Sequence, residues 1–327
     1  MRVWAALRYG ICAIVVSVGV MQSAQAQVIP GKTMRFILGF PPGGAVDLIG
    51  RAVAPGIGEA VGTSVVVDNR PGANGAIGAE LLVKSPADGT VIGLVSISSM
   101  VLNVHMTPNP SYHTLRDFTP ITNVGLVPFA VTVHPAVPAK SVKELVALAR
   151  SRPGKVTVGS PGVGGLQHLA IEMLNDSGKI KLLHVPYKGT GPAMTDVLGG
   201  HIDGMMAAVS GVIGAAKSGK LRVIAITAAE RSPALPDVPT AQEQGLPGFI
   251  VVNWYAIVGP ANMPAAPLNA LHGAIVKTVA SPAVRDKLIA SGVDPKTDAS
   301  PAVFAAFVRD EFTRWEKVVR RANITAQ

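Results

Sequence analysis

Two glycine-rich turns carry the residues with the clearest chemical potential in this sequence. The first turn, PPGG at residues 41–44, follows a short apolar run and precedes a helical pattern that begins near Asp47. The second turn, residues 160–165, is also followed by apolar residues at helical spacing. Glycine permits φ > 0 and close backbone approach, and a helix N-terminus presents free N–H groups and the positive end of a dipole. Each turn is therefore a candidate anion site, although a plain strand-to-helix connection also fits either turn taken alone.

Signatures of catalysis and of nucleotide binding are lacking. The sequence has no G-x-S-x-G, H-E-x-x-H or Walker motif. Residues 162–165 approach the dinucleotide pattern G-x-G-x-x-G, but Gln167 stands where the third glycine belongs. The single cysteine, Cys12, lies in the N-terminal segment, so the mature chain offers no disulfide, thiolate nucleophile or cysteine metal ligand. We therefore expect no enzyme, no catalytic residues, no cofactor and no metal.

A few other side chains allow more than one interpretation. His168 and Glu172 are spaced i, i+4, which a metal can use, but a hydrogen-bonded pair on a helix surface is the favoured interpretation. Trp254 and Tyr255 lie on an expected buried strand, where core packing is favoured over lining a cleft. Lys188 fits a solvated loop lysine and an anion-steering charge equally well.

The N-terminal segment has the pattern of a secretory signal. Arg2 and Arg8 are followed by the apolar run 11–20, which is too short to cross a bilayer comfortably. Ala24-Gln25-Ala26 then forms an A-x-A cleavage site, so the mature chain is expected to begin at Gln27. Export without cysteines favours the bacterial periplasm, and a retained membrane anchor is the alternative.

Composition narrows the possible partners. The chain has 327 residues, a net charge of +9 and only 15% charged residues. Its basic residues are scattered and its aromatic content is 5%, so a nucleic-acid role is not supported. A mild positive field instead favours small anionic molecules.

Strands and helices alternate along the sequence, and each glycine-rich turn lies between one of each. Asp47 is expected to cap the first helix, and Ser141-Val142-Lys143-Glu144 is a capping box for a later one. The pattern predicts an α/β fold with a mainly parallel sheet in each of two domains. An apolar run over 121–133, interrupted by Pro128, is expected to carry the chain into the second domain, and a strand over 251–258 to return it. Ligands of such folds bind beyond the carboxyl ends of the strands, so the two turns are expected to face each other.

Longer stretches of the sequence carry a family resemblance. They share their order along the chain and cover nearly all of its mature part: FPPGG (40–44), VVVDNRPGANGAIGAE (65–80), PADGT (86–90), VPAKSVKELVALA (137–149), HVPYKGTGPAMTDVLGG (184–200), GKLRVIAIT (219–227), RSPALPDVPT (231–240) and GLPGF (245–249). The sequence resembles the Bug or TctC family, the periplasmic solute-binding proteins of tripartite tricarboxylate transporters. The resemblance implies a two-domain Venus-flytrap fold that holds a carboxylate between its domains.

The resemblance also implies a domain division, a binding site and partners. Domain 1 comprises 27–127 with 250–327, and domain 2 comprises 128–249. The loops at 41–47 and 160–165 are expected to grip the ligand carboxylates, largely through backbone N–H groups and ordered water. The ligand-binding residues that we predict are Phe40, Pro42, Gly43, Gly44, Ala45, Asp47, Ser98, Ser160, Val163, Gly164, Gly165, His168, Tyr187 and Ala207. The expected partners of the monomer are two membrane permease subunits. A membrane sensor kinase is the alternative partner, and an enzyme acting on carboxylic acids is a weaker rival.

The sequence departs from the family pattern at three places in the expected pocket. Ala45 and Val46 follow the second glycine, where the family commonly has small hydroxyl residues. The second loop has Val163 and two glycines where the family is rich in Ser, Thr and Asn. Ala207 and Ala208 stand where an Asp or Asn often faces the ligand. These departures predict a ligand with one carboxylate and an apolar or aromatic body, rather than a highly hydroxylated tricarboxylate.

Overall fold

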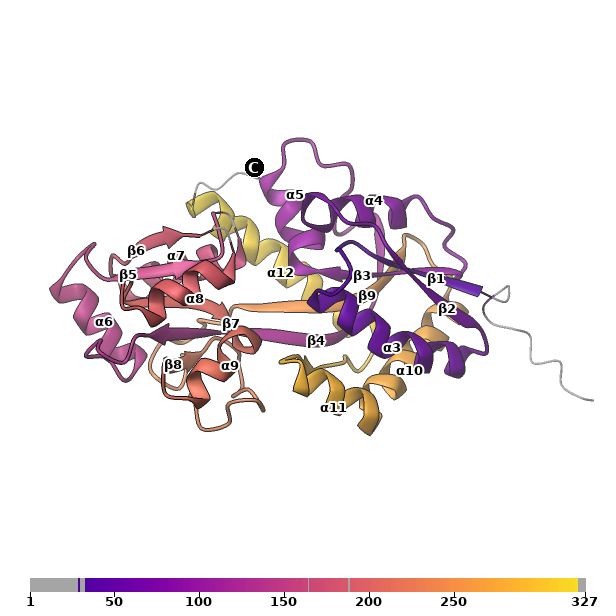
Figure 1. The fold of residues 1–327 in the computed structure, drawn as a ribbon. Helices are drawn as coiled ribbons and strands as arrows, with labels where there is room; N and C mark the ends of the chain where they lie inside the picture. The colour runs from indigo at the N-terminus through magenta and orange to yellow at the C-terminus, as the bar shows by residue number, and fades with distance from the viewer. Residues whose placement is uncertain (1–28, 30–32, 164, 188, 323–327) are drawn as a thin grey trace, which may run out of the picture.

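The computed structural model describes Ile29 and residues 33–163, 165–187 and 189–322 (Figure 1). The predicted cleavage after Ala26 lies outside the described residues, as do Gly164 and Lys188. Two lobes lie side by side, and a long strand runs from one into the other (Figure 1). No helix of the described part of the chain is long and apolar enough to cross a membrane.

The chain first builds most of one lobe, here called lobe A. Its first elements alternate between strand and helix, as the sequence pattern predicted. They are β1 (Thr33–Leu38), α3 (Ala45–Val61), β2 (Ser64–Asn69), the 3₁₀ turn η1 (Ala73–Gly75), α4 (Ala76–Val83), β3 (Val91–Ser96), the π-helical turn η2 (Ser98–Leu102) and α5 (Asn103–Met106). The helical turns η2 and α5 were not expected from the sequence.

The strand β4 (Phe118–Val133) crosses into lobe B, as expected for the apolar run around Pro128. Lobe B again alternates helices and strands. Its elements are α6 (Val142–Ser151), β5 (Thr157–Ser160), α7 (Leu166–Gly178), β6 (Leu183–Pro186), α8 (Thr190–Leu198), β7 (Gly204–Ala208), α9 (Val209–Lys217) and β8 (Arg222–Ile226). The predicted capping box is present at the start of α6, where Ser141 Oγ accepts the Glu144 N–H over 3.1 Å.

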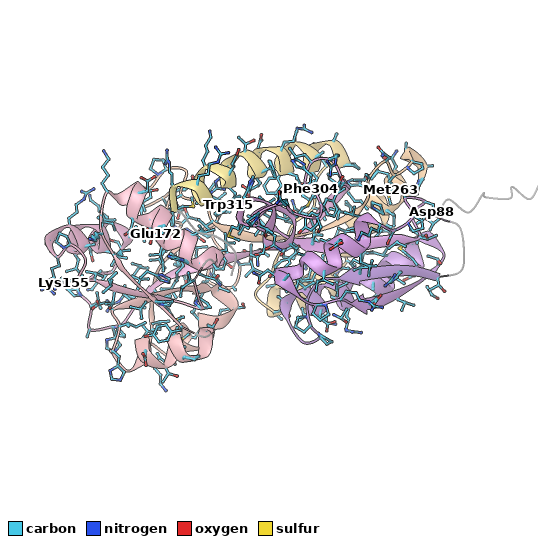
Figure 2. All side chains as sticks on the ribbon, turned by 90° about the horizontal axis from the view of Figure 1, so that it is seen from above. Asp88, Lys155, Glu172, Met263, Phe304 and Trp315 are labelled. Carbon is cyan, nitrogen blue, oxygen red and sulfur yellow. The ribbon has the colours of Figure 1, made fainter. Side chains whose placement is uncertain are left out.

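The chain then returns to lobe A through β9 and ends in helices. These last elements are β9 (Val252–Pro260), α10 (Ala265–Ala280), α11 (Pro282–Ala290), β10 (Asp294–Pro295) and α12 (Pro301–Ala322). The helix α12 lies along one side of the molecule and reaches from lobe A to lobe B (Figure 2). Trp254 of β9 packs edge-to-face on Phe304 of α12, and its indole donates to the buried carboxylate of Glu311 over 3.1 Å. These contacts hold α12 on the back of the sheet.

The strands form one curved mixed sheet with the order β2-β1-β3-β9-β4-β7-β5-β6, to which β8 and β10 add by pairing with β4. The outer strands of each lobe are parallel, as predicted: β2, β1 and β3 in lobe A and β6, β5 and β7 in lobe B. The two crossing strands β4 and β9 pair antiparallel with each other and with their neighbours. The fold is therefore the expected α/β two-lobed one, with antiparallel strands only where the chain passes between the lobes and at the small additions β8 and β10.

The register shows where the strands of both lobes end. In lobe A, β3 runs antiparallel to β9, and its last residue Ser96 pairs with Tyr255 near the start of β9. In lobe B, β7 ends at Ala208, which pairs with Phe129 of β4. Because β1 is parallel to β3 and β5 is parallel to β7, the carboxyl ends of all four strands point toward the middle of β4. Any ligand site beyond those ends lies at the junction of the lobes.

One threonine stands at this junction. Up to Pro128, β4 pairs with β9, and from Phe129 onward it pairs with β7 and β8. Thr227 lies between Phe129 and Val251: its Oγ1 accepts the Phe129 N–H over 3.0 Å and donates to the Val251 carbonyl over 2.5 Å. The Thr227 hydroxyl thus bridges the Phe129 N–H and the Val251 carbonyl, in place of a direct hydrogen bond between these two residues.

Candidate functional site

The first glycine-rich turn connects the end of β1 to the start of α3 at the junction of the lobes. Pro42, Gly43, Gly44 and Ala45 are exposed, whereas Phe40 is half-buried. Gly43 has a φ of +85°, a conformation that L residues rarely adopt, so this position requires glycine. The N-cap of α3 is Gly44, and no side chain caps the helix there. The first N–H groups of α3 therefore have no acceptor inside the helix.

A hydrogen-bonded network around Asp47 holds this turn in place. Asp47 is 6% exposed. Its carboxylate accepts the Gly43 N–H over 3.1 Å, Arg51 Nε over 2.9 Å and Asn69 Nδ2 over 3.1 Å. Asn69 Nδ2 also donates to the Phe40 carbonyl over 3.0 Å. Burial by itself would raise the pKa of Asp47, but the hydrogen bonds from Arg51, Gly43 and Asn69 outweigh it, so the pKa lies below its usual value.

This network corrects one detail of the prediction. The Gly43 N–H, which the sequence analysis assigned to the ligand, is bound by the Asp47 carboxylate. The expected capping of α3 by Asp47 is wrong: no side chain caps this helix, and the Asp47 carboxylate instead accepts the N–H of Gly43, the residue before the N-cap. The donors left for a ligand at this turn begin at Gly44 and Ala45.

The second glycine-rich turn leaves β5 and starts α7. Ser160 has no exposed surface, and its Oγ donates to the Gly162 carbonyl over 2.9 Å and lies 2.7 Å from His184 Nε2. The hydroxyl shapes the turn here, and its predicted contact with a ligand stays a prediction. Val163, by contrast, is 53% exposed, and Gly165 is the exposed N-cap of α7. As at α3, no side chain caps this helix.

Two stacked histidines, His168 and His184, lie beside this turn, and His184 contacts its first residue, Ser160. The rings of His168 on α7 and His184 on β6 lie 3.9 Å apart at 17°. Burial lowers the pKa of both, and that of His184 to about 4, so the rings are neutral near pH 7. Glu172 Oε1 is 3.8 Å from His168 Nε2, so the two side chains are neighbours on α7 but farther apart than the hydrogen bond of the favoured interpretation. In the described part of the chain, no group of three His, Cys, Asp or Glu side chains is arranged to hold a metal.

The other predicted residues fall into different environments. Tyr187 is half-buried, and its hydroxyl donates to Asp196 over 2.7 Å; burial and this bond raise its pKa to about 12. Ser98 is half-buried at the start of η2, just beyond the end of β3. Ala207 has no exposed surface and pairs with Ala130 inside lobe B, and its predicted contact with a ligand stays a prediction.

Three residues that were not predicted from the sequence support the two turns. Asn69 and Arg51 fix the first turn, and His184 fixes the second. A signal existed for Asn69, because it is a polar residue at the carboxyl end of a strand. His184 had no such signal, because it lies within β6 and not at the carboxyl end of the strand.

This arrangement suits binding rather than catalysis. The Ser160 and His184 side chains are within hydrogen-bond distance, but the serine is fully buried and its hydroxyl already donates to a carbonyl. It cannot approach a substrate as a nucleophile in this state. Two uncapped helix N-termini beside exposed glycines can instead hold an anion without proton transfer.

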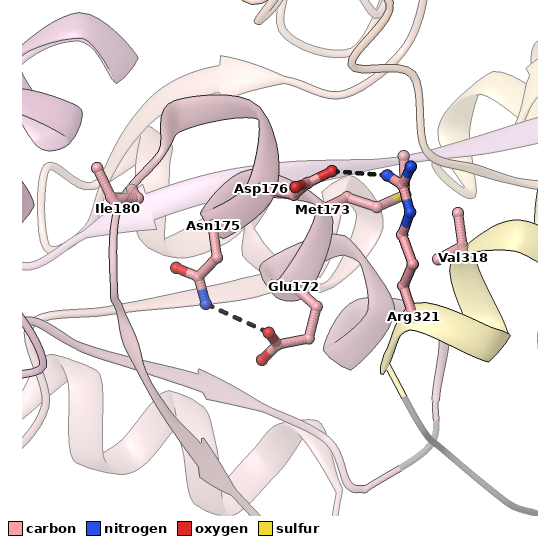
Figure 3. A pocket seen from close by; sticks show the side chains of 7 residues that line it. All are labelled: Glu172, Met173, Asn175, Asp176, Ile180, Val318 and Arg321. Atoms are coloured by element: carbon pink, nitrogen blue, oxygen red, sulfur yellow. Dashed lines mark hydrogen bonds and ion pairs between the residues drawn. The ribbon is translucent and has the colours of Figure 1, made fainter.

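A separate groove lies between α7 and α12, as Figure 3 shows. It has a volume of ≈ 330 Å³, and Arg321 and Asp176 form an ion pair of 3.1 Å beside it. Its lining on α7 runs from Glu172 to Asp176, in the C-terminal half of the helix. The glycine-rich turn precedes the other end of α7, so this groove is not part of the site described above.

Comparison with known proteins gives a consistent assignment. Residues 49–324 match the family described as the tripartite tricarboxylate transporter family receptor (TctC). The chain is 33% identical to Protein BugT of Bordetella pertussis over 310 residues, which is 94% of this chain and 95% of BugT.

Solved structures with the same fold include two from Rhodopseudomonas palustris. MatC, solved with bound malate, superposes with a TM-score of 0.70 at 28% identity, over 89% of this chain and 100% of MatC. A second R. palustris protein, solved with adipate, gives a TM-score of 0.73 at 29% identity, over 90% and 99% of the two chains.

Proposed function

Since this chain belongs to the tripartite tricarboxylate transporter family of receptors and is a periplasmic solute-binding protein rather than an enzyme, we propose that it captures a small carboxylate between its two lobes. The proposed ligand carries one carboxylate on an apolar or aromatic body. Release to two membrane permease subunits completes the proposed cycle.

One observation carries the proposal for the site. Two helices, α3 and α7, begin at exposed glycines that no side chain caps, and each follows a strand whose carboxyl end points to the junction of the lobes. A carboxylate beside such an N-terminus accepts free N–H groups and meets the positive end of the helix dipole. The malate and adipate bound by the two R. palustris proteins support a carboxylate ligand.

The side chains around the turns support the apolar body of the ligand. Val163 presents an apolar side chain at the second turn, and Ala45 is exposed at the first. The charge of Asp47 is balanced by Arg51, so the first turn offers no unbalanced cation for additional carboxylates. A ligand with several charged or hydroxyl groups would leave many of them without a partner here.

Closure of the lobes requires a division near the middle of β4. We propose lobes of 27–127 with 250–327 and of 128–249. The change in the pairing of β4 between Pro128 and Phe129 supports this boundary. The junction would then bend where Thr227 joins the crossing segments.

Calorimetric titration of the refolded, ligand-stripped protein tests the proposal. The panel contains benzoate and its hydroxylated derivatives, adipate, malate and citrate, and small-angle scattering follows compaction. A true ligand at a hundredfold excess over its Kd raises the free energy of unfolding by about 2.7 kcal/mol and makes the protein more compact. A clear preference for citrate would contradict the proposed ligand class, and stabilisation without compaction would contradict closure.

A further inference from the structure

A polar pair with unfilled hydrogen-bonding capacity lies on β9. Asn253 Nδ2 donates to Tyr255 Oη over 2.9 Å. Asn253 Oδ1 is buried and has no hydrogen-bond partner. Buried polar atoms are rarely left without a partner, because desolvation is then uncompensated. At a binding site, such an atom is available to a partner that arrives with the ligand.

The register places this pair where the strands of both lobes end. Tyr255 pairs with Ser96, the last residue of β3, so Asn253 lies beyond the end of β3 and opposite Val127 of β4. The middle of β4, to which the carboxyl ends of β1, β3, β5 and β7 point, follows directly after Val127. The pair therefore lies at the junction of the lobes.

Asn253 and Tyr255 lie on the face of the sheet against which α3, the helix after the first glycine-rich turn, packs. Tyr255 is 6% exposed and packs in the same apolar cluster as Val46 and Ile49 of α3. Trp254, the next residue back along the strand, faces α12 on the other side. Since side chains alternate along a strand, Asn253 shares the face of Tyr255 and of the α3 N-terminus. Asn253 is only half-buried, so it lies at the edge of the packed interior.

The second buried amide oxygen without a partner, Asn123 Oδ1, has a different setting. The Asn123 N–H and Nδ2 both donate to Asp298 Oδ2, over 2.8 and 3.1 Å. Asn123 pairs with Ala256, farther from the ends of the strands. It is tied to a loop of lobe A rather than to the junction.

The chemistry of the pair selects the group that completes it. Burial raises the pKa of Tyr255 to about 12, so the phenol keeps its proton. The phenol oxygen accepts from Asn253 Nδ2, which leaves the phenol proton to be donated, while Asn253 Oδ1 needs a donor. If the oxygen and nitrogen of the Asn253 amide are exchanged, the amide oxygen accepts from the phenol and the NH₂ group is the one without a partner. A carboxylate only accepts hydrogen bonds, whereas a hydroxyl both donates and accepts.

We propose that Asn253 and Tyr255 form a subsite for a single hydroxyl group of the bound acid, an inference that rests on the proposed carboxylate-binding function. The carboxylate lies at the N-terminus of α3, and the hydroxyl projects toward β9 on the same face. The ligand class narrows to small hydroxy acids with an otherwise apolar body.

Affinity ratios within ligand pairs that differ by one hydroxyl test the subsite. Benzoate is compared with its 2-, 3- and 4-hydroxy derivatives, and succinate with malate, by calorimetry. Wild-type protein is expected to bind at least one hydroxylated member about tenfold more tightly, as one hydrogen bond to a buried partner provides. Asn253→Leu and Tyr255→Phe should each reduce that ratio to within about twofold while retaining the parent acid.

Tyr112→Phe is the matched control. Tyr112 is a buried tyrosine of lobe A whose hydroxyl donates to the Ser99 carbonyl and not to the Asn253–Tyr255 pair. Its loss should lower stability without changing the affinity ratio. Equal ratios in wild type, Asn253→Leu and Tyr255→Phe would overturn the subsite while leaving carboxylate binding intact. Failure of every acid to bind would overturn the proposed function and the subsite together.

Discussion

Replacing Thr227 by valine tests the role of the hydroxyl at the junction of the lobes. Valine has nearly the shape of threonine, so the packing is kept and only Oγ1 is lost. Thr227 has no exposed surface. Its Oγ1 is the acceptor for the Phe129 N–H and a donor to the Val251 carbonyl. The substitution therefore leaves a buried N–H without an acceptor and a carbonyl without this donor.

The expected loss follows from these two groups. A buried donor left unsatisfied costs about 1–3 kcal/mol, and loss of a net hydrogen bond costs about 1 kcal/mol. We expect Thr227→Val to lower the free energy of unfolding by roughly 2–4 kcal/mol. The backbone bonds from Thr227 N–H to Phe129 O and from Val251 N–H to Thr227 O remain, which limits the loss.

Thr132→Val is the matched control. Thr132 is also a buried strand threonine, 1% exposed, but its Oγ1 makes one bond, donated to the Met205 carbonyl over 2.8 Å. No N–H depends on it, so its loss should cost only about 0.5–1.5 kcal/mol.

Urea unfolding of the ligand-free protein gives both free energies, and amide hydrogen exchange reports on the Phe129 N–H directly. The Phe129 amide should exchange faster in Thr227→Val and remain protected in Thr132→Val. Equal losses of stability in the two variants, or an unchanged Phe129 amide in Thr227→Val, would refute the assignment of a bridging hydroxyl.

Three further predictions concern the turns, a buried acid and processing. Gly43→Ala should lower the free energy of unfolding by about 1–2 kcal/mol, because φ is +85° there, whereas Gly165→Ala, with φ at −72°, should change it by less than about 0.5 kcal/mol; thermal melts compare them. Burial raises the pKa of Asp294 from 3.8 to about 6, against the hydrogen bond from Ser232. The folded state therefore binds the proton more tightly, and this acid's contribution to stability falls as pH rises from 3.8 through 6. Asp294→Asn should gain stability relative to wild type over that range and keep a constant advantage above it. Urea unfolding at a series of pH values measures both free energies, and the same pH dependence in the two proteins would contradict this. Mass spectrometry of the periplasmic fraction should find a chain that begins at Gln27, and a dominant species starting at Met1 would contradict the cleavage.

Local sequence signals were sufficient for most elements and for the position of the turns. The prolines and glycines of residues 41–44 end β1, and the apolar spacing after them specifies α3. The Ser141–Glu144 capping box predicted the start of α6 for the same reason. The interactions that determine these features lie within a few residues of each other, so the sequence itself displays them.

The same locality explains what the sequence could not show at the site. The sequence shows that Gly43 precedes a helix, but the carboxylate that takes its N–H is oriented by Asn69, which is 22 positions from Asp47. Ser160 begins a glycine-rich turn, but its hydroxyl lies within hydrogen-bond distance of His184 on the neighbouring strand. Which donors stay free for a ligand is decided by such distant partners.

What the sequence determined by itself is thus the family, the alternation of strands and helices, and the two glycine-rich turns that each precede a helix. Only the tertiary structure decided that the carboxyl ends of four strands meet at the middle of β4, that Thr227 joins segments 98 and 24 residues away, and that Asn253 and Tyr255 lie on the same face as α3. The physical reason is that backbone conformation responds mainly to neighbours along the chain, whereas the register of a sheet, and the pairing of buried polar atoms, depend on which strands become neighbours in space.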